Sequence, residues 1–230
     1  GRTAIDLSKF NLPMENPYLP LTRSDGTSMY LLRDMAYTIY KENKAKDRNI
    51  IVLGEDQKLY FQQLKAILSI LNKKAPEAIH YSFVLLPSGK MSTRRGEVVL
   101  LDDFMKEIKN KAKEEIIKRH VKIGNIEKIS KIISYAALKF SILRVSPDKN
   151  ITFEIEKALS FEGETGSFIQ YAHTRANSIL KKQKNSKKPD YSLLTAESEL
   201  KLIKKLSEFS GTVETAAKHL HPHIVAGYSF

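Results

Sequence analysis

The stretch Asn49-Ile50-Ile51-Val52-Leu53-Gly54 is a continuous run of apolar, mostly β-branched residues that ends in a glycine. Such a run is typical of a strand that is buried on both faces of a parallel sheet. The next apolar residues, from Leu59 to Leu71, recur at the spacing of a helix. Because a strand followed by a helix is the repeating unit of parallel α/β sheets, this stretch predicts an α/β fold for the first half of the chain.

A strand and a helix are also predicted before this unit. Residues 18–23 have the apolar character of a short strand and lead into the turn sequence Ser24-Asp25-Gly26. Thr27 or Ser28 can then cap a helix that runs to about Lys44. The strand, turn and helix therefore form a second unit of the same kind.

After Leu71 the alternation continues to the middle of the chain. Residues 80–86 predict a strand, residues 87–97 a polar loop, and residues 98–101 a second apolar stretch. A long charged helix is predicted from Asp102 to about His120. We therefore assign residues 1–118 to one α/β domain with a parallel sheet.

The second half is predicted to be helical. From residue 126 to residue 140 apolar residues recur at intervals of three and four, as in a helix that faces a core. Ser146-Pro147-Asp148 ends this helix, and further helices are predicted at 168–180, 195–209 and 213–220. We assign residues 119–230 to an all-α bundle.

Composition narrows the possible functions. The 230 residues include 38 Lys and Arg against 26 Asp and Glu, a net charge of +12, so nucleic acid is the leading partner class. The 42% hydrophobic content excludes disorder of the whole chain. The absence of cysteine excludes disulfides, a thiolate nucleophile and sulfur-based zinc sites. No apolar run is long enough to cross a membrane, so we expect a soluble, cytoplasmic protein that does not bind membranes.

Tyr30 and Asp34 are four residues apart on a predicted helix, and therefore share one face. Gln57 follows a predicted parallel strand, at the sheet edge where ligands bind in α/β proteins. A carboxylate, a phenol and a carboxamide together suit a cation such as a guanidinium. From spacing alone, the alternative is more common: Asp34 is solvated on the helix, and Tyr30 packs on the sheet.

Residues 88–96, Ser-Gly-Lys-Met-Ser-Thr-Arg-Arg-Gly, place three cations and two hydroxyls between glycines. Such a loop can close on phosphate oxygens, although a plain solvated turn explains the composition equally well. It is not a P-loop, because Val84 stands where that motif needs glycine and Met91 replaces the hydroxyl that binds magnesium.

Two other patterns support no chemistry. His219, His221 and His223 have spacing that suits a strand, and no nearby carboxylate or cysteine completes a metal site, so we expect no protein-bound metal. No arrangement of Ser, His and Asp supports a nucleophilic hydrolase. The lysine-rich residues 181–188 are more typical of an exposed linker than of a binding groove.

Four stretches follow one another along the chain in a distinctive order: Arg23–Asp34, Gln57–Leu64, Met91–Asp103 and Ala158–Arg175. The first contains Tyr-Leu-Leu-Arg-Asp, the third Met-Ser-Thr-Arg-Arg-Gly, and the fourth Ser-Phe-Glu-Gly-Glu-Thr-Gly. In this order they resemble the arginyl-tRNA synthetases, which are class I aminoacyl-tRNA synthetases. The resemblance covers nearly the whole chain.

The resemblance implies that Tyr30, Asp34 and Gln57 bind the guanidinium of arginine. It implies that the loop is a variant of the KMSKS signature, which closes over ATP and stabilises the pyrophosphate leaving group. The catalytic residues would be Lys90, Ser92, Arg94 and Arg95, and the ATP-binding residues Lys90, Met91, Ser92 and Thr93. Thr93 replaces the usual second lysine, so Arg94 and Arg95 are the candidates for its charge. Tyr60 replaces an expected histidine.

The second half is similar to the anticodon-binding bundle of class I synthetases, which implies tRNA-Arg as a partner. Tyr171 and Arg175, four apart on one helix, are the candidate tRNA contacts, with packing between helices as the equally common alternative. The resemblance implies that residues 1–118 are the C-terminal half of a nucleotide-binding, Rossmann-like parallel sheet domain. The family's HIGH-like signature is not found in these 230 residues, and the last residues resemble part of the last conserved helix of the bundle. We therefore expect a C-terminal piece of a longer enzyme, truncated at its C-terminus too.

The resemblance implies an arginine–tRNA ligase that acts as a monomer. Its substrate ATP would be bound together with Mg²⁺. The chain by itself is expected to be inactive. The alternative from another class is a non-catalytic synthetase remnant that binds RNA or regulates. A free-standing arginine-binding protein would leave the basic second half unexplained.

Overall fold

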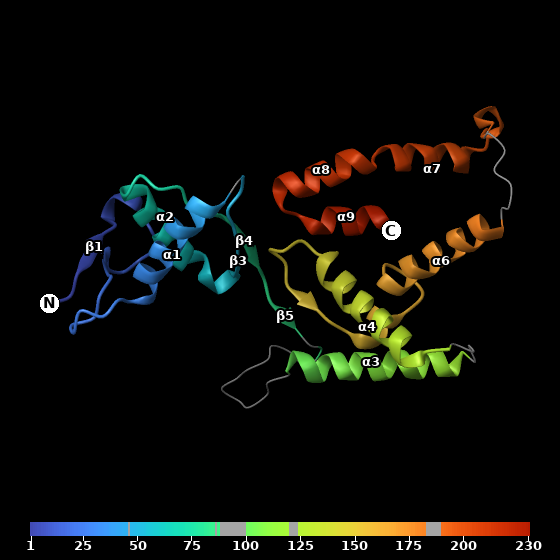
Figure 1. Cartoon of the computed structure of the whole chain (residues 1–230), viewed down its shortest axis with the longest axis horizontal. Helices are drawn as coiled ribbons and strands as arrows, with labels where there is room; N and C mark the ends of the chain where they lie inside the picture. Colours follow the sequence, from blue (N-terminus) through green and yellow to red (C-terminus); the bar gives the residue numbers. More distant parts are fainter. Residues whose placement is uncertain (46, 86, 88–99, 120–123, 183–189) are drawn as a thin grey trace. The chain divides into compact units, whose positions relative to one another are not determined.

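The computed structural model describes residues 1–45, 47–85, 87, 100–119, 124–182 and 190–230 (Figure 1). Packing divides the chain into two compact units, Gly1–Phe83 and Val84–Phe230. Each unit has a hydrophobic core of its own.

Unit 1 combines two small sheets with two helices. Strands β1 (Ala4–Asp6) and β2 (Tyr18–Pro20) pair antiparallel, and β3 (Ile50–Gly54) and β4 (Glu77–Tyr81) pair parallel. The other elements are η1 (Ser8–Phe10), α1 (Tyr30–Lys44), η2 (Glu55–Gln57) and α2 (Lys58–Ile70). The succession β3, α2, β4 is a parallel strand–helix–strand unit, as the sequence predicts.

The core of unit 1 consists of large apolar side chains. On α2, Leu64, Ile67 and Leu68 are almost fully buried, at the spacing that places them on one helix face. Leu31 of α1 and Leu7 join them. This core fixes α1 and α2 relative to each other, and these are the helices that carry the candidate site.

The prediction that strand 49–54 is buried on both faces is wrong. Ile51 and Leu53 pack against the core, whereas Ile50 is 40% exposed and Val52 is 61% exposed. Alternate residues of a strand point to opposite faces, so β3 is covered on one face only by the described residues of unit 1.

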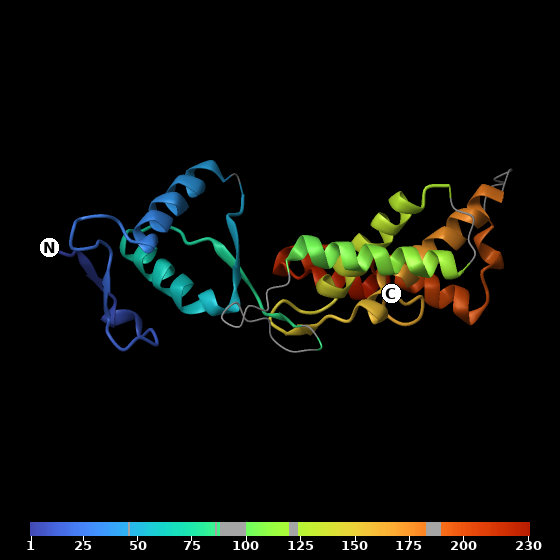
Figure 2. The same ribbon diagram turned by 90° about the horizontal axis from the view of Figure 1, so that it is seen from below.

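Unit 2 is mainly helical (Figure 2). A short parallel pair, β5 (Val84–Leu85) with β6 (Ile151–Thr152), accompanies the helices. The helical elements are α3 (Leu101–Lys118), α4 (Ile126–Leu143), α5 (Ile155–Leu159), α6 (Gly166–Lys182), η4 (Tyr191–Leu193), α7 (Glu197–Ser207), α8 (Phe209–His219) and α9 (Pro222–Ser229).

Helices α3 and α4 form the centre of unit 2. Ile108 and Ala112 of α3 are buried against Ala137 of α4, and Phe153 packs edge-on against Phe104 with ring centroids 5.1 Å apart. Because α3 packs on α4, the division by packing falls before α3, between residues 83 and 84. The functional boundary at residue 118 stays a prediction.

Two local predictions differ from the structure. Helix α1 begins at Tyr30 with Met29 as its N-cap, so neither Thr27 nor Ser28 caps it; the Ser28 hydroxyl instead accepts a hydrogen bond from Arg33 Nε at 2.9 Å. The single strand predicted at 80–86 is two strands, β4 and β5, in different units. Strand β6 and helix α5 are too short to give a periodic signal.

The turn between α8 and α9 depends on one residue. Leu220 has φ 57° and ψ 39°, the left-handed conformation, and forms the C-cap of α8. The backbone N–H of His221 donates to the carbonyl of Ala216 at 2.9 Å, which closes the end of the helix. The left-handed residue thereby reverses the chain direction.

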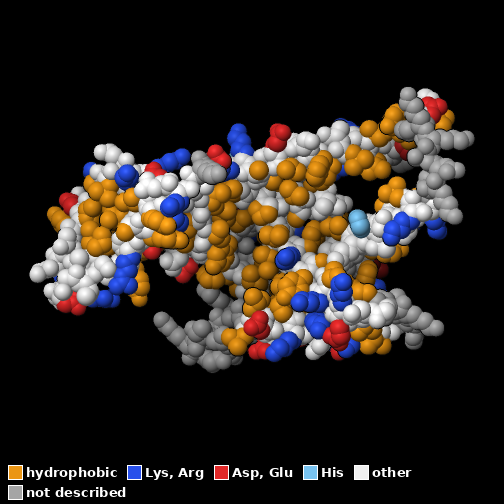
Figure 3. Space-filling model, in the orientation of Figure 1, with side chains coloured by type: hydrophobic (Ala, Val, Ile, Leu, Met, Phe, Trp, Pro, Cys, Tyr) orange, Lys and Arg blue, Asp and Glu red, His pale blue; other side chains and the backbone are white. Residues whose placement is uncertain are grey.

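Apolar side chains lie at the surface of α7 and α8 (orange in Figure 3). Leu202, Leu206, Phe209 and Val213 are between 39% and 61% exposed, at helical spacing. No helix in the described ranges is both long enough and apolar enough to cross a membrane.

Candidate functional site

The packing of α1 on α2 joins two polar side chains that are 26 residues apart. Tyr60, in the first turn of α2, donates its hydroxyl hydrogen bond to Oδ2 of Asp34, in the second turn of α1. Asp34 is exposed, and Tyr60 is half-buried. A carboxylate at the surface is therefore held by a donor that is anchored in the interior.

The protonation of Tyr60 suits this role as a donor. Burial raises the pKa of the phenol above its usual value, and the hydrogen bond to Asp34 and its charge raise it further. The hydroxyl therefore keeps its proton throughout the neutral and mildly alkaline range.

Gln57 lies at the start of the same helix. It ends η2, directly after β3, and is the N-cap residue of α2, three residues before Tyr60. Its Nε2 donates to Oδ2 of Asp56 at 3.1 Å, and the side chain is exposed. Gln57 and Tyr60 share one side of the first turn of α2, so Gln57 is on the same side of the helix as the residue that contacts Asp34.

Two further contacts fix the loop between β3 and α2. Glu55 accepts a hydrogen bond from the Ser82 hydroxyl at 2.8 Å and forms an ion pair with Lys58 at 2.8 Å. Ser82 follows β4, so these contacts tie η2 to the carboxyl ends of both parallel strands. This is the sheet edge at which α/β proteins bind ligands.

Tyr30 is the first residue of α1, one turn before Asp34, and is 73% exposed. The alternative in which Tyr30 packs on the sheet is therefore wrong. Its phenol is available to a ligand at the end of α1, on the face that carries the Asp34 carboxylate.

The geometry suits a planar cation. The Asp34 carboxylate can accept parallel hydrogen bonds from a guanidinium, while the exposed carboxamide of Gln57 and the phenol of Tyr30 supply a neutral acceptor and a ring face. Sequence reasoning missed the contact of Tyr60 with Asp34. The signal available was the three-residue spacing of Tyr60 from Gln57, which predicts a shared face but not a partner on another helix.

The KMSKS-like residues lie outside the described ranges. This applies to Lys90, Met91, Ser92, Thr93, Arg94 and Arg95. Their roles as catalytic and ATP-binding residues stay predictions.

The candidate tRNA residues meet on α6. The guanidinium carbon of Arg175 lies 5.7 Å from the ring centroid of Tyr171, which is 50% exposed. The buried residues of α6 are Gly166 and Ser167 at its start. Tyr171 and Arg175 therefore form an exposed cation–π pair on this helix.

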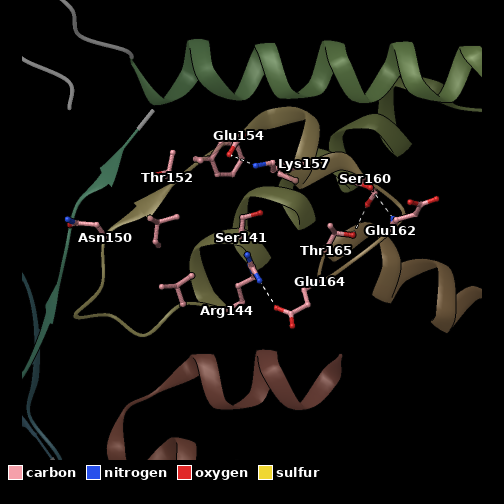
Figure 4. Close-up of a pocket in the computed structure, with 14 residues that line it drawn as sticks. Ser141, Arg144, Asn150, Thr152, Glu154, Lys157, Ser160, Glu162, Glu164 and Thr165 are labelled. Carbon is pink, nitrogen blue, oxygen red and sulfur yellow. Dashed lines mark hydrogen bonds and ion pairs between the residues drawn. The ribbon is translucent and has the colours of Figure 1, made fainter. Parts of the chain in front are cut away.

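A cavity of about 560 Å³ opens in unit 2 between the end of α4, β6, α5 and the loop before α6 (Figure 4). Four of its charged side chains form two ion pairs: Arg144 with Glu164 at 2.6 Å, and Lys157 with Glu154 at 2.7 Å. The Thr165 hydroxyl donates to the carbonyl of Ser160 at 2.6 Å. The fourth distinctive stretch of the sequence thus builds one wall of this cavity.

The three histidines near the C-terminus lie in a row, but not on a strand. His219 ends α8, His221 is the N-cap of α9, and His223 is within α9. Their ring centroids are 6.1 Å and 5.0 Å apart in succession. In the described residues, no three side chains of His, Asp or Glu form a group that could hold a metal ion.

Comparisons with known proteins agree with this architecture. The model of the class I tRNA synthetase (R) catalytic domain matches residues 1–154, and the model of the DALR anticodon binding domain matches residues 169–230. The first match spans both packing units.

Curated relatives match along the whole chain. The arginine–tRNA ligase of Methanocella arvoryzae is 46% identical over 100% of this chain and 40% of its own length. That of Methanocaldococcus jannaschii is 42% identical over 97% of this chain and 39% of its own length. The chain therefore spans about 40% of the length of these relatives.

Solved structures match the fold. The Thermus thermophilus arginyl-tRNA synthetase superposes with a TM-score of 0.86 at 27% identity, over 100% of this chain and 44% of that one. A Campylobacter jejuni structure at 17% identity and a TM-score of 0.70 shows the fold alone. The prediction of an α/β part from a class I synthetase followed by a helical bundle is confirmed. The chain belongs to the arginyl-tRNA synthetase family of class I tRNA synthetases.

Proposed function

We propose that this chain supplies the arginine-binding and tRNA-binding parts of an arginine–tRNA ligase. In this reaction, the arginine carboxylate attacks the α-phosphate of ATP, which gives an arginyl adenylate and releases pyrophosphate. A terminal ribose hydroxyl of the tRNA then takes the arginyl group and releases AMP. Positioning and charge stabilisation account for most of such catalysis, so no dedicated general base is required.

One observation carries the proposal: the exposed carboxylate of Asp34 is held by Tyr60 on the side of α2 where Gln57 begins the helix. Asp34 would accept two parallel hydrogen bonds from the substrate guanidinium, and Gln57 and Tyr30 would complete the contacts. A fixed carboxylate next to a neutral acceptor favours a planar fork of donors over a single ammonium group.

The remaining substrates have candidate sites elsewhere in the chain. ATP, with Mg²⁺, would be held by Lys90, Met91, Ser92 and Thr93, and the developing pyrophosphate charge would be stabilised by Lys90, Ser92, Arg94 and Arg95. In the bundle, Tyr171 would stack on a base of tRNA-Arg while Arg175 contacts phosphate. We place the functional boundary between these parts at residue 118, and the enzyme in the cytoplasm as a monomer.

The test is a calorimetric titration of the 230-residue chain with arginine and with lysine. We expect arginine to bind and lysine to bind much more weakly. Asp34→Asn keeps the shape of the side chain but removes its charge, and should weaken arginine binding about 100-fold, because hydrogen bonds to charged groups are the strong ones. Asp47→Asn changes an exposed carboxylate outside the site and should leave binding unchanged.

Failure to bind arginine, or equal binding by wild type and Asp34→Asn, would refute the assignment of the site. Aminoacylation is measured separately, because the chain spans about 40% of the length of its curated relatives. We expect no arginyl-tRNA from the 230 residues alone. The alternative, a non-catalytic RNA-binding remnant, predicts tRNA binding without arginine binding.

A further inference from the structure

We propose that Tyr60 is a positioning residue for the amino-acid substrate: its hydroxyl fixes the plane of the Asp34 carboxylate so that the free lone pairs face an incoming guanidinium. The inference rests on the proposed function, because it requires Asp34 to be the group that binds arginine. Tyr60 itself need not touch the substrate.

Buried neighbours anchor both side chains of the Tyr60–Asp34 pair. Tyr60 is followed by Phe61 and then by Leu64, and both are buried in the core of unit 1. Asp34 is one turn after Leu31, which is buried in the same core. The hydrogen bond therefore connects two rigid helices, so that the position of its donor is set by the fold.

The hydrogen bond from Tyr60 restricts the rotation of the Asp34 carboxylate. The terminal torsion of an aspartate is broad, so an exposed carboxylate with no partner samples many orientations. In this structure Asp34 is exposed, and the Tyr60 hydroxyl is bonded to its Oδ2. A bidentate contact with a guanidinium needs the two oxygens and the two donors in one plane, so a fixed carboxylate loses less freedom when arginine binds.

The Tyr60 hydroxyl leaves the Asp34 carboxylate able to accept further hydrogen bonds, and it adds no charge. A carboxylate offers about four acceptor positions, and the phenol uses one of them, which leaves both oxygens able to accept from a guanidinium. Burial keeps the phenol protonated. A neutral donor orients the carboxylate without adding a positive charge that would compete with the substrate, whereas a lysine at this position would neutralise it.

The test compares arginine with lysine on a variant that lacks only the hydroxyl. Tyr60→Phe keeps the ring, so no cavity forms in the half-buried position. We expect its dissociation constant for arginine to rise about tenfold, the usual scale for losing a hydrogen bond to a charged group. The inhibition constant of lysine, measured by competition with labelled arginine, should change less than about twofold, because an ammonium is a point charge that needs no fixed plane.

Two further variants separate positioning from a general loss of structure. Tyr40→Phe removes a hydroxyl from an exposed tyrosine on the helix that carries Asp34, and should bind both ligands as wild type does. Tyr60→His restores a donor, and at about pH 8, where an imidazole is neutral, it should recover part of the lost arginine affinity.

Each outcome decides between the two proposals. Wild-type arginine affinity in Tyr60→Phe, or an equal loss for arginine and lysine, overturns the positioning role while leaving Asp34 as the binding group. Absence of arginine binding by the wild-type chain, or undiminished binding by Asp34→Asn, overturns the proposed function itself and the inference with it.

Discussion

The two packing units differ in the side chains that lie between their helices. In unit 1, leucine, isoleucine and phenylalanine of α1 and α2 make up most of the core, together with Leu7 and Ala66. In unit 2, α4 buries Ser130, Ser134 and Ala137, and α6 buries Gly166 and Ser167 where it meets α4. Unit 2 also buries large side chains such as Ile108 and Phe153, but its helices α4 and α6 approach each other closely at Gly166.

Two of the small buried polar residues of unit 2, Ser130 and Ser134, form hydrogen bonds within their own helix. The hydroxyl of Ser130 donates to the carbonyl of Glu127 at 3.1 Å, and that of Ser134 donates to the carbonyl of Lys131 at 2.9 Å. Each serine therefore acts as a small space-filling side chain without needing a partner on another helix. We therefore predict that truncating a buried core side chain lowers the stability of unit 1 most. Adding a side chain where α4 and α6 meet should lower the stability of unit 2.

The largest effect is expected from Leu68→Ala. Leu68 is fully buried in unit 1, so truncation loses apolar burial and leaves a cavity, and should lower the free energy of unfolding by about 2–5 kcal/mol. Hydrogen exchange should show lower protection in α2 but unchanged protection in α4. Val52→Ala, at a 61% exposed position, should change stability by less than about 0.5 kcal/mol. Equal loss of protection in both units would break the comparison.

The opposite substitution tests unit 2. A Cβ at Gly166 would lie 2.7 Å from the carbonyl oxygen of Ala136, so Gly166→Ala must push α6 away from α4 and should cost about 1–3 kcal/mol. Gly211→Ala is the matched control, since nothing lies within 4 Å of its Cβ in α8; it should be neutral or stabilising by up to about 1 kcal/mol. Urea unfolding measures both. An unchanged free energy of unfolding in Gly166→Ala would show that the close contact between α6 and α4 does not stabilise unit 2.

A smaller effect is expected at the start of α6. The Thr165 hydroxyl accepts from the backbone N–H of Phe168 at 3.1 Å and donates to the carbonyl of Ser160. Thr165→Ala should therefore destabilise unit 2 by about 1 kcal/mol, as for other lost helix caps. Thr165→Ser keeps both hydrogen bonds and should recover most of the stability in the same unfolding experiment.

The smallest effect concerns charge at the contact between α3 and α4. Glu127 pairs with Lys109 at 2.6 Å and with Lys113, and these hydrogen bonds lower its pKa to about 2. A lowered carboxyl pKa stabilises the fold above the unfolded value of about 4.5, and the contribution is lost as the pH falls towards 2. The melting temperature of Glu127→Gln should thus lie slightly below wild type at pH 7 and meet it near pH 2. High salt should shrink the difference at pH 7, because the pair is exposed.

Much of the fold follows from local pattern. The helical periods of α2 and α4 predict their type and nearly their ends, because both helices are long and periodic, and the continuous apolar run at 49–54 predicts β3. The burial of β3 is not predicted correctly, because the cover of a strand is a tertiary property that its own residues do not specify. Strand β6 has two residues and gives no period at all.

The candidate site shows the same limit. Helical spacing places Tyr30 with Asp34, and Tyr171 with Arg175, since neighbours four residues apart share a face. The contact between Tyr60 and Asp34 depends instead on how α2 packs on α1, and no spacing within either helix predicts it. The family resemblance marks Tyr60 as unusual, and the structure supplies its partner.

The left-handed residue at the end of α8 has a consequence for handedness. For an L-amino acid, this conformation costs about 1–2 kcal/mol, because Cβ crowds the following carbonyl. Leu220 adopts this conformation, with φ 57°. A D-leucine introduced there by chemical ligation has the mirror-image preference, so it would relieve the crowding while keeping the side chain. The turn between α8 and α9 is thus a point at which the fold runs against the chirality of its own building blocks.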